Sequence, residues 1–338
     1  MNSLERVLAT LQGEPTDRRA VSLTLSLYGA RLTGCRLTEY YTNPVAYARG
    51  ASAVMETFQP DILFGPFALC LEGEAFGSRV RFYEDQAPNL TRPAISSSGE
   101  IAQLAAPDIE THPRLRFFRA TIRRMAAEHG QQVPIAAVAL GPMGLPAMIM
   151  GIEGWLETLL FDEAGTQRML EMSVPYFVRW ANVLLAEGAS LVVVPAAFAN
   201  PTIVTREMAA RIAVPALKEA YSQINGPLIV HSAGASLAPF LDLLADLPNV
   251  VGFMLNHGDS FAEARARVGA QATLIGNIDG PTLHMREPDE IAAECRKVLH
   301  DRRDDPRFIL GTSAADIGFD TPVENIHAVL RAAQASRL

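Results

Sequence analysis

The sequence predicts an α/β fold, a (β/α)8 TIM barrel, because short apolar runs alternate with helical stretches along the whole chain. The apolar runs are continuous, as expected for parallel strands that are buried on both faces. The stretches between them repeat their apolar residues with helical spacing, as in residues 166–186. Eight such alternations fit a closed barrel of eight strands. The predicted strands cover residues 20–25, 62–65, 134–140, 191–194, 227–231, 250–255, 272–275 and 307–310.

Three further structural features are expected in addition to these strands. Residues 3–11 form an amphipathic run that stops at Gly13, which predicts an N-terminal helix that caps the barrel. Residues 78–84 alternate polar and apolar side chains and precede a proline-rich segment, which predicts a hairpin inserted after the second strand. Pro175 is expected to kink the helix over residues 166–186. No repeat or long linker divides the chain, so residues 1–338 are predicted to be one barrel domain.

Composition and charge exclude several function classes. With 29 basic and 37 acidic residues the net charge is −8, and no basic cluster could follow a nucleic-acid backbone. No apolar run approaches the roughly 18 residues of a membrane span, and no export segment is evident, so a cytoplasmic protein is expected. Cys35, Cys70 and Cys295 are widely spaced, which is typical of a reduced compartment and argues against a thiolate-rich zinc site.

Candidate catalytic residues follow the predicted strands, because barrel enzymes gather their chemistry at the carboxyl ends of the strands. His231 ends the fifth strand and is expected to act as an acid or base near working pH; the alternative is a hydrogen-bonded core histidine. Asp279 follows the seventh strand, where it could also be a turn residue. Asp316 follows the last strand and could accept a proton, pair with His231, or cap the next helix.

Candidate substrate-binding residues lie in the same predicted loops. Asn256 and His257 follow the sixth strand, with Asp259 placed to fix the histidine tautomer; the alternative is a polar turn. Glu72 and Glu74 are two residues apart, which puts both carboxylates on one side of an extended segment unless they belong to a solvated loop.

The first predicted strand is followed by Tyr28 and Arg31. These two side chains could bind an anionic or aromatic substrate, with the guanidinium as a bidentate donor, or they could lie on the surface. Cys70 is the cysteine closest to a predicted strand end, and we expect it to be buried.

Several short motifs, taken in their order, resemble the uroporphyrinogen decarboxylase superfamily, which includes methylcobalamin:coenzyme M methyltransferase-like enzymes linked to corrinoids. The motifs are Gly13-Glu14-Pro15-Thr16-Asp17-Arg18, Glu72-Gly73-Glu74-Ala75-Phe76-Gly77, Gly276-Asn277-Ile278-Asp279, and Thr321-Pro322 with Glu324-Asn325-Ile326. The resemblance implies a (β/α)8 barrel with an open cleft. Uroporphyrinogen decarboxylases carry an Arg-Gln-Ala-Gly-Arg run near the first strand to hold substrate carboxylates. Here that region contains one arginine, Arg31, so decarboxylation of uroporphyrinogen itself is not expected.

The methyltransferase branch is the more similar one, and in it the resemblance implies zinc held by a histidine, a cysteine two residues later, and the cysteine of the last motif. His231 matches the histidine, but Ala233 and Ala315 stand at the two cysteine positions. Zinc and any other tightly bound cofactor are therefore not expected.

The resulting hypothesis is methyl transfer or demethylation between a small methylated substrate and a corrinoid (cobalamin) or tetrahydrofolate carrier, with a corrinoid protein as the expected partner. Two alternatives stay open. One is a decarboxylase or carbon-carbon lyase acting on a small non-porphyrin acid, and the other is a non-catalytic ligand-binding barrel.

Overall fold

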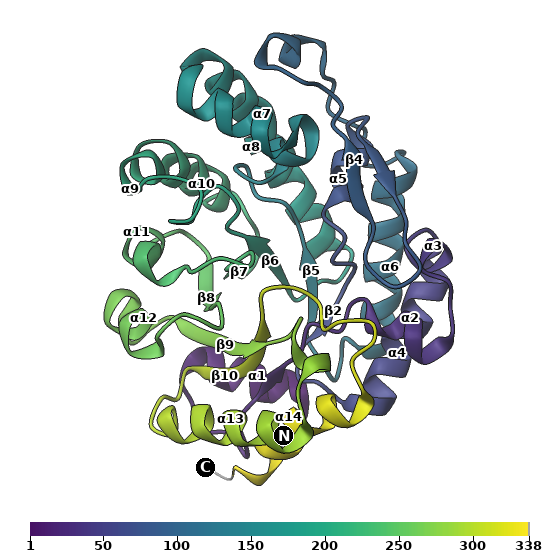
Figure 1. Cartoon of the computed structure of the whole chain (residues 1–338), viewed down its shortest axis with the longest axis vertical. Helices are drawn as coiled ribbons and strands as arrows, with labels where there is room; N and C mark the ends of the chain where they lie inside the picture. Colours follow the sequence, from purple (N-terminus) through teal and green to yellow (C-terminus); the bar gives the residue numbers. More distant parts are fainter. Residues whose placement is uncertain (337–338) are drawn as a thin grey trace.

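The computed structural model describes residues 1–336 and shows eight parallel strands arranged as a nearly closed barrel (Figure 1). Neighbouring strands pair in the order β1-β10-β9-β8-β7-β6-β5-β2. The predicted (β/α)8 architecture is confirmed. The barrel strands are β1 Val21–Ser22, β2 Leu63–Phe64, β5 Ile135–Val138, β6 Leu191–Pro195, β7 Leu228–His231, β8 Val250–Met254, β9 Thr273–Asp279 and β10 Phe308–Ser313.

Helices connect the strands and surround them (Figure 1). Helix α8 continues through Pro175, whereas α7 is interrupted at Gly151, where φ is 80°. The α-helices are α1 Ser3–Gln12, α2 Tyr28–Thr33, α3 Leu37–Tyr40, α4 Pro44–Phe58, α5 Cys70–Ala75, α6 Pro113–His129, α7 Leu145–Phe161, α8 Glu163–Ala186, α9 Arg206–Met208, α10 Val214–Tyr221, α11 Leu241–Leu244, α12 Phe261–Val268, α13 Pro288–Asp301 and α14 Val323–Ala335. Shorter turns of helix are η1 Ser98–Gln103, η2 Ala209–Ala213, η3 Ala238–Phe240 and η4 Leu283–Met285. No helix in residues 1–336 has both the length and the apolar character needed to cross a bilayer.

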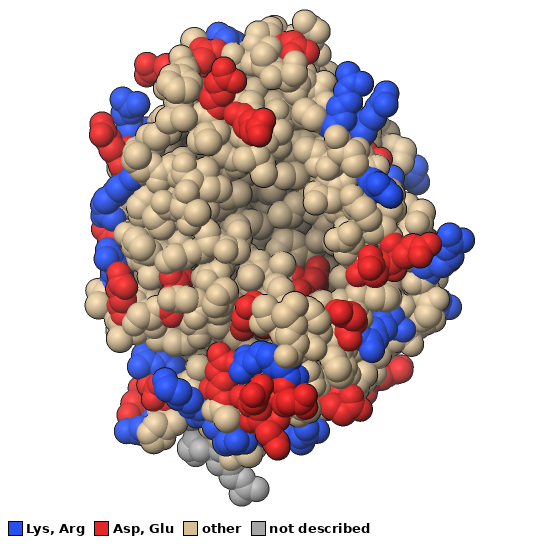
Figure 2. All heavy atoms as spheres, viewed as in Figure 1, with Lys and Arg blue, Asp and Glu red and all other residues tan. Residues whose placement is uncertain are grey.

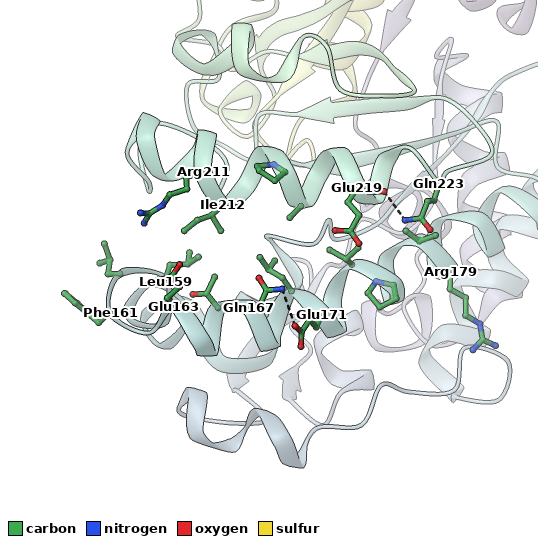
Figure 3. A pocket seen from close by; sticks show the side chains of 18 residues that line it. Leu159, Phe161, Glu163, Gln167, Glu171, Arg179, Arg211, Ile212, Glu219 and Gln223 are labelled. Atoms are coloured by element: carbon green, nitrogen blue, oxygen red, sulfur yellow. Dashed lines mark hydrogen bonds between the residues drawn. The ribbon is translucent and has the colours of Figure 1, made fainter.

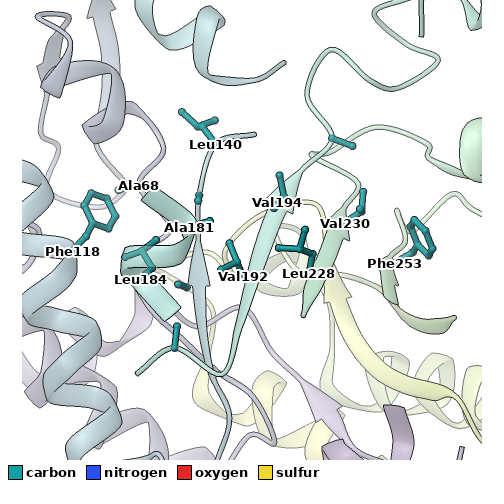
Figure 4. Packing of buried hydrophobic residues seen from close by; sticks show 14 of the residues in the cluster. Ala68, Phe118, Leu140, Ala181, Leu184, Val192, Val194, Leu228, Val230 and Phe253 are labelled. Carbon is teal, nitrogen blue, oxygen red and sulfur yellow. The ribbon is translucent and has the colours of Figure 1, made fainter. Parts of the chain in front are cut away.

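The strands bury two separate apolar layers, because successive side chains of a strand point to opposite faces. One layer fills the barrel interior, and Val7 of α1 belongs to it. The other lies between the barrel and its helices, where Val192, Val194, Leu228 and Val230 of β6 and β7 are buried in one cluster with residues of α8 (Figure 4). The interior layer consists of Val7, Ala20, Ile62, Phe64, Ala136, Val138, Leu191, Val193, Ile229, Met254, Ile275 and Ile309.

Helix α1 covers the amino-terminal end of the barrel. It starts with a capping box in which the Asn2 side chain and Glu5 bond each other's backbone N–H groups. It ends at Gly13, whose φ of 73° lies in the left-handed region that favours glycine. Because Val7 packs into the barrel interior, this helix seals the end opposite to the strand carboxyl ends.

Asp61 joins β1 to β2, the two strands that no ladder of backbone pairs connects. Its backbone N–H donates to the Val21 carbonyl at 2.8 Å, and its carboxylate accepts the Val21 N–H at 2.8 Å. The same buried carboxylate accepts hydrogen bonds from Arg6 at 2.7 Å and Arg18 at 2.6 Å. A carboxylate that is fully removed from water is stabilised only by such paired donors. This ion-pair cluster therefore replaces the missing ladder and completes the barrel.

The predicted hairpin after the second barrel strand is confirmed as the antiparallel pair β3 Arg79–Arg81 and β4 Asn89–Arg92 (Figure 1). Strands β9 and β10 extend beyond the prediction, which ended them at residues 275 and 310. Apart from Ile278, the additional residues are polar or glycine and so do not look like buried strand, yet they keep the parallel register, with Gly311 opposite Asn277 and Ser313 opposite Asp279. Asn277 and Asp279 are therefore strand residues rather than loop residues.

Candidate active site

The alternation of side chains along the strands places polar residues in the barrel interior, near the carboxyl ends of the strands. Ile229 faces the barrel interior, so His231, two residues later, faces it as well. Met254 also faces the interior, and the same alternation places Asn256 on that side. We call the interior polar set on the adjacent strands β7, β8, β9, β10 and β1 the polar crescent. Its members are His231, Asn256, Asn277, Ser313 and Ser22, and all five are buried.

His231 is a neutral hydrogen-bond donor. Its Nδ1 accepts the Ala233 backbone N–H at 2.9 Å, so the ring proton is on Nε2. Nε2 is buried without a hydrogen-bond partner among residues 1–336. Burial lowers the pKa of His231 to about 4, so the ring is uncharged at neutral pH. This differs from the expected titration near working pH, because desolvation disfavours the charged ring.

Other members of the polar crescent also have unused hydrogen-bonding capacity. Asn256 Nδ2, Ser22 Oγ and Ser313 Oγ are buried and lack a partner within the described part of the chain, as does Ser232 Oγ beside His231. Buried polar groups without partners are rare in proteins and mark sites where a ligand or water binds. The sequence reasoning missed Ser22, Ser232 and Ser313; the available signal was a polar residue inside or directly after an apolar run.

Asp259 and Asn277 hold the loops around the polar crescent. The Asp259 carboxylate accepts the backbone N–H groups of Leu237 and Asn256, both at 3.0 Å, and the Ser236 hydroxyl at 2.5 Å. Asn277 Nδ2 donates to the carbonyls of Asn256 at 3.1 Å and Asp259 at 2.9 Å. Asp259 therefore organises the loops after β7 and β8 and is not placed to fix the tautomer of His257.

The predicted candidates Asp279 and Asp316, with His257, lie at the rim of the barrel. The His257 side chain is half exposed, and its Nδ1 lies 3.9 Å from Asp279 Oδ2, which also accepts the Thr282 hydroxyl at 3.0 Å. Asp316 Oδ1 accepts the Leu27 N–H at 3.2 Å, and burial raises the pKa of Asp316 to about 7. Within residues 1–336, no hydrogen bond or ion pair joins Asp316 to His231, so the expected pairing is not formed.

Glu72 and Glu74 do not form a carboxylate pair, because they lie on helix α5 rather than on an extended segment. Residues two apart on a helix point in different directions. Glu72 is buried and accepts the Leu140 N–H at 2.9 Å, and burial raises its pKa to about 8. Glu74 forms an ion pair with Arg114 of α6, whose Nη2 donates to Oε1 at 3.1 Å.

Tyr28 and Arg31 bind the protein's own backbone. Tyr28 is fully buried and its hydroxyl donates to the Thr321 carbonyl. Arg31 Nη1 donates to the carbonyls of Phe319 at 2.6 Å and Thr321 at 2.7 Å, and its guanidinium carbon lies 5.2 Å from the Tyr28 ring centroid. Both side chains therefore fasten α2 to the loop after β10, which differs from their expected role as substrate anchors.

A cavity of about 520 Å³ opens at the carboxyl ends of β1, β2, β9 and β10, beside the loop of the hairpin. We call it the mouth cavity. Its wall includes the rings of Phe67 and Phe319 and the carboxylates of Asp85, Asp316 and Asp320. Phe67 also meets the His231 ring edge to face, with centroids 5.5 Å apart, so the cavity adjoins the polar crescent. Figure 2 shows this face hollowed at its centre, with acidic side chains beside the hollow.

A larger cavity of about 830 Å³ lies on the outside of the barrel, between α8 and α10 (Figure 3). The end of α7 contributes Leu159 and Phe161, and the Phe161 side chain is largely exposed. Glu171, Arg211 and Glu219 give this groove charges of both signs. It contains none of the polar residues at the strand ends, so the mouth cavity is the better candidate for the active site.

The donor set at the strand ends does not fit the zinc implied by the family resemblance. Ala233 and Ala315 offer no ligand atom near His231. Residues 1–336 contain no group of three His, Cys, Asp or Glu side chains close enough to hold a metal ion. Cys70 is buried in the cavity wall as expected, where its thiol donates to the Pro88 carbonyl at 3.0 Å and burial raises its pKa to about 12. Tetrahedral zinc with two thiolates therefore has no counterpart here.

Comparison with known proteins places these features in a family. The chain is 25% identical over 339 residues to methylcobamide:CoM methyltransferase MtaA of Methanosarcina barkeri, covering 97% of this chain and 96% of the relative. It is 27% identical over 244 residues to a uroporphyrinogen decarboxylase of Ralstonia nicotianae, covering 68% and 65%.

Among solved structures, a methyltransferase from Methanosarcina mazei has the same fold, with a TM-score of 0.87 at 21% identity and 99% coverage of both chains. A B12-independent methionine synthase from Shewanella has a TM-score of 0.58 at 12% identity, with 88% and 89% coverage. The family model for uroporphyrinogen decarboxylase (URO-D) matches residues 2–336. The chain belongs to the uroporphyrinogen decarboxylase family.

Proposed function

We propose that this protein is a corrinoid-linked methyltransferase that moves a methyl group between a small methylated substrate and a corrinoid, without a zinc-bound thiolate. The observation that carries the proposal is the end-to-end similarity to methylcobamide:CoM methyltransferases, which spans 97% of the chain. The mouth cavity supports it, because a small substrate can bind at the strand ends where barrel enzymes place their chemistry.

We treat the corrinoid as a co-substrate, either free or bound to a partner protein. Residues 1–336 form the barrel and its hairpin, and these described residues include no separate domain that could hold a corrinoid. When bound, it supplies a cobalt centre that accepts or donates the methyl group. The protein's own contribution is to orient the two reactants and to exclude water. His231 would donate from Nε2 to an acceptor atom of the substrate, and Asn256 Nδ2 would provide a second donor from the next strand.

The absence of a zinc ligand set has a chemical consequence. Zinc activates a thiol by stabilising its thiolate. In this protein a thiol acceptor would need a base instead, and His231 is a poor base because its Nδ1 lone pair is already used by the Ala233 N–H. The proposed reaction is the half that exchanges a methyl group between substrate and corrinoid, which needs no thiolate.

The decarboxylase alternative has less support in the site. A small acid would need a cation to hold its carboxylate, yet no lysine or arginine is among the described residues that line the mouth cavity. Arg31, the residue expected to serve as this anchor, is bound to the carbonyls of Phe319 and Thr321.

The test is methyl transfer by the purified protein. We would supply cob(I)alamin with a panel of methylated donors and follow the formation of methylcob(III)alamin by its absorbance. A donor-dependent, enzyme-dependent conversion is expected, and it should be retained in the control variant His300→Gln, because His300 is exposed on α13. A protein that converts no donor in this assay, but releases carbon dioxide from a small acid, would contradict the proposal.

A further inference from the structure

The charge of the mouth cavity carries information on the substrate. Three carboxylates line it, at Asp85, Asp316 and Asp320. They come from three places in the chain, namely the hairpin loop, the residues just after β10, and the start of the segment that leads to α14. None of these three takes part in the lysine or arginine ion pairs found in residues 1–336. Burial raises the pKa of Asp316 to about 7, so this carboxyl is partly protonated at neutral pH, and the charge of the rim rests mainly on Asp85 and Asp320. The Asp320 carboxylate has a histidine beside it, with His284 Nε2 at 4.0 Å from Oδ2.

Apart from Gln86 and Asn89, the side chains of the remaining wall are mostly apolar or aromatic. Phe67 and Phe319 contribute rings, and Leu27, Leu69 and Met148 contribute aliphatic or thioether surface. Aromatic faces attract cations through their negative quadrupole, and this attraction is largest for cations that are weakly hydrated, such as methylated ammonium groups. Carboxylates add a longer-range attraction of the same sign.

The cavity also adjoins an uncharged, buried donor. Phe67 lines the cavity and contacts the ring of His231, whose Nε2 has no partner in the described chain and whose ring is neutral at pH 7. An uncharged imidazole does not repel a cation that binds beside it, and its Nε2–H remains able to donate to a polar substituent of the substrate.

We propose that the methyl donor bound in the mouth cavity is a methylated onium cation, a quaternary ammonium or a trialkylsulfonium, held between Phe67, Phe319 and the three rim carboxylates. This inference deepens the proposed function and rests on it. The carbon–nitrogen (or carbon–sulfur) bond breaks, and its electron pair stays on the nitrogen or sulfur, which leaves as a neutral amine or thioether. The methyl carbon takes the electron pair of a Co(I) corrinoid, and the cobalt is oxidised to Co(III). No proton is required.

Binding tests the inference independently of catalysis. Isothermal titration calorimetry on the whole purified chain would compare choline, trimethylsulfonium and 3,3-dimethylbutan-1-ol, which is the uncharged isostere of choline. We expect one or both cations to bind at least about tenfold more tightly than the alcohol, a difference within the range of cation–π and carboxylate attraction together. The ratio of the two cations distinguishes an ammonium site from a sulfonium site.

The rim carboxylates provide matched variants. Asp85→Asn and Asp320→Asn are expected to weaken cation binding several-fold each and to leave binding of the alcohol unchanged, because both residues are exposed and the ionic contact of Asp320, with His284, is long at 4.0 Å. Asp246→Asn removes the same charge from an exposed residue that precedes β8, at the other end of the barrel, and should bind the cations as the unaltered protein does.

The outcomes separate this inference from the function on which it rests. Equal affinity for the cations and the alcohol, or full cation affinity in the double variant Asp85→Asn with Asp320→Asn, would overturn the onium site. If methyl transfer then proceeds from a neutral methyl ether, the proposed function stands without it. Saturable cation binding that depends on the rim carboxylates, without methyl transfer to cob(I)alamin, would support the onium site and count against the methyltransferase.

Discussion

His231 is held in one tautomer by a single backbone contact, the Ala233 N–H on Nδ1. That contact removes its capacity to act as a base and leaves Nε2–H as a donor in the barrel interior. The residue type and its strand-end position were readable from the sequence. Its protonation state was not, because that depends on the burial supplied by residues from other strands.

Substitutions of His231 can distinguish a role as a hydrogen-bond donor from a role as an acid or base. His231→Gln can present an amide N–H near the position of Nε2, so we expect it to retain methyl transfer within about tenfold of the unaltered protein. His231→Leu removes the donor and should reduce kcat about 100-fold, as is typical for loss of one preorganised donor. The measurement is kcat with thermal melting as the folding control. If Gln and Leu reduce kcat equally while both variants stay folded, the donor role is wrong.

The raised pKa of Glu72 makes the stability of the folded protein depend on pH. Its pKa rises from an ordinary value of roughly 4.3 to about 8 in the folded protein, because burial disfavours the carboxylate. The folded state therefore binds the Glu72 proton more tightly than the unfolded state does. The stability from this proton is fully present below about pH 4 and is lost as the pH rises through about 8.

Glu72→Gln keeps an oxygen acceptor for the Leu140 N–H but has no proton to lose. We expect the variant's melting temperature, relative to that of the unaltered protein, to rise steadily from pH 5 to pH 9. Differential scanning calorimetry across this range measures the difference. A difference that stays constant with pH would mean that Glu72 is ionised in the folded protein throughout.

At the scale of secondary structure, buried strands were predictable and short helices were not. The apolar runs identified all eight barrel strands, because burial on both faces leaves a continuous hydrophobic signal. The six residues of α5 are too few for a helical period, so Glu72 and Glu74 were assigned to an extended segment. The ends of β9 and β10 were missed for the opposite reason: their last residues face the polar barrel interior.

The junction of β1 and β2 depends on Asp61, which makes four side-chain contacts to Ser3, Arg6, Arg18 and the Val21 N–H. Asp61→Asn removes the negative charge and leaves two arginines beside a buried neutral group. We expect a loss of about 3 kcal/mol in the free energy of unfolding, typical of breaking a buried ion pair. Urea unfolding measures it.

The matched control for Asp61 is Asp301→Asn, which breaks an exposed ion pair with Lys297 within helix α13. Exposed pairs of this kind contribute little to stability. A similar, small effect of both substitutions would show that the barrel closes without the Asp61 cluster.

For the whole molecule, the architecture follows from the sequence more completely than the site does. The barrel, the hairpin and the strand-end position of His231 were all predicted. Tyr28, Arg31 and Glu74 were expected to bind a substrate, but each one binds another part of the protein. The sequence does not show which distant residues a side chain contacts in the folded chain. The serines of the polar crescent were missed because small hydroxyls are common within strands.

The central claim is methyl transfer by a barrel whose strand ends lack a zinc ligand set, and metal removal tests it most directly. The initial rate of methylcob(III)alamin formation would be measured before and after exhaustive dialysis against a chelator, with the zinc content determined in the same samples. The account predicts equal rates, since His231 acts as a neutral donor and Ala233 and Ala315 offer no ligand. A rate that is abolished by the chelator and restored by one equivalent of zinc would contradict it.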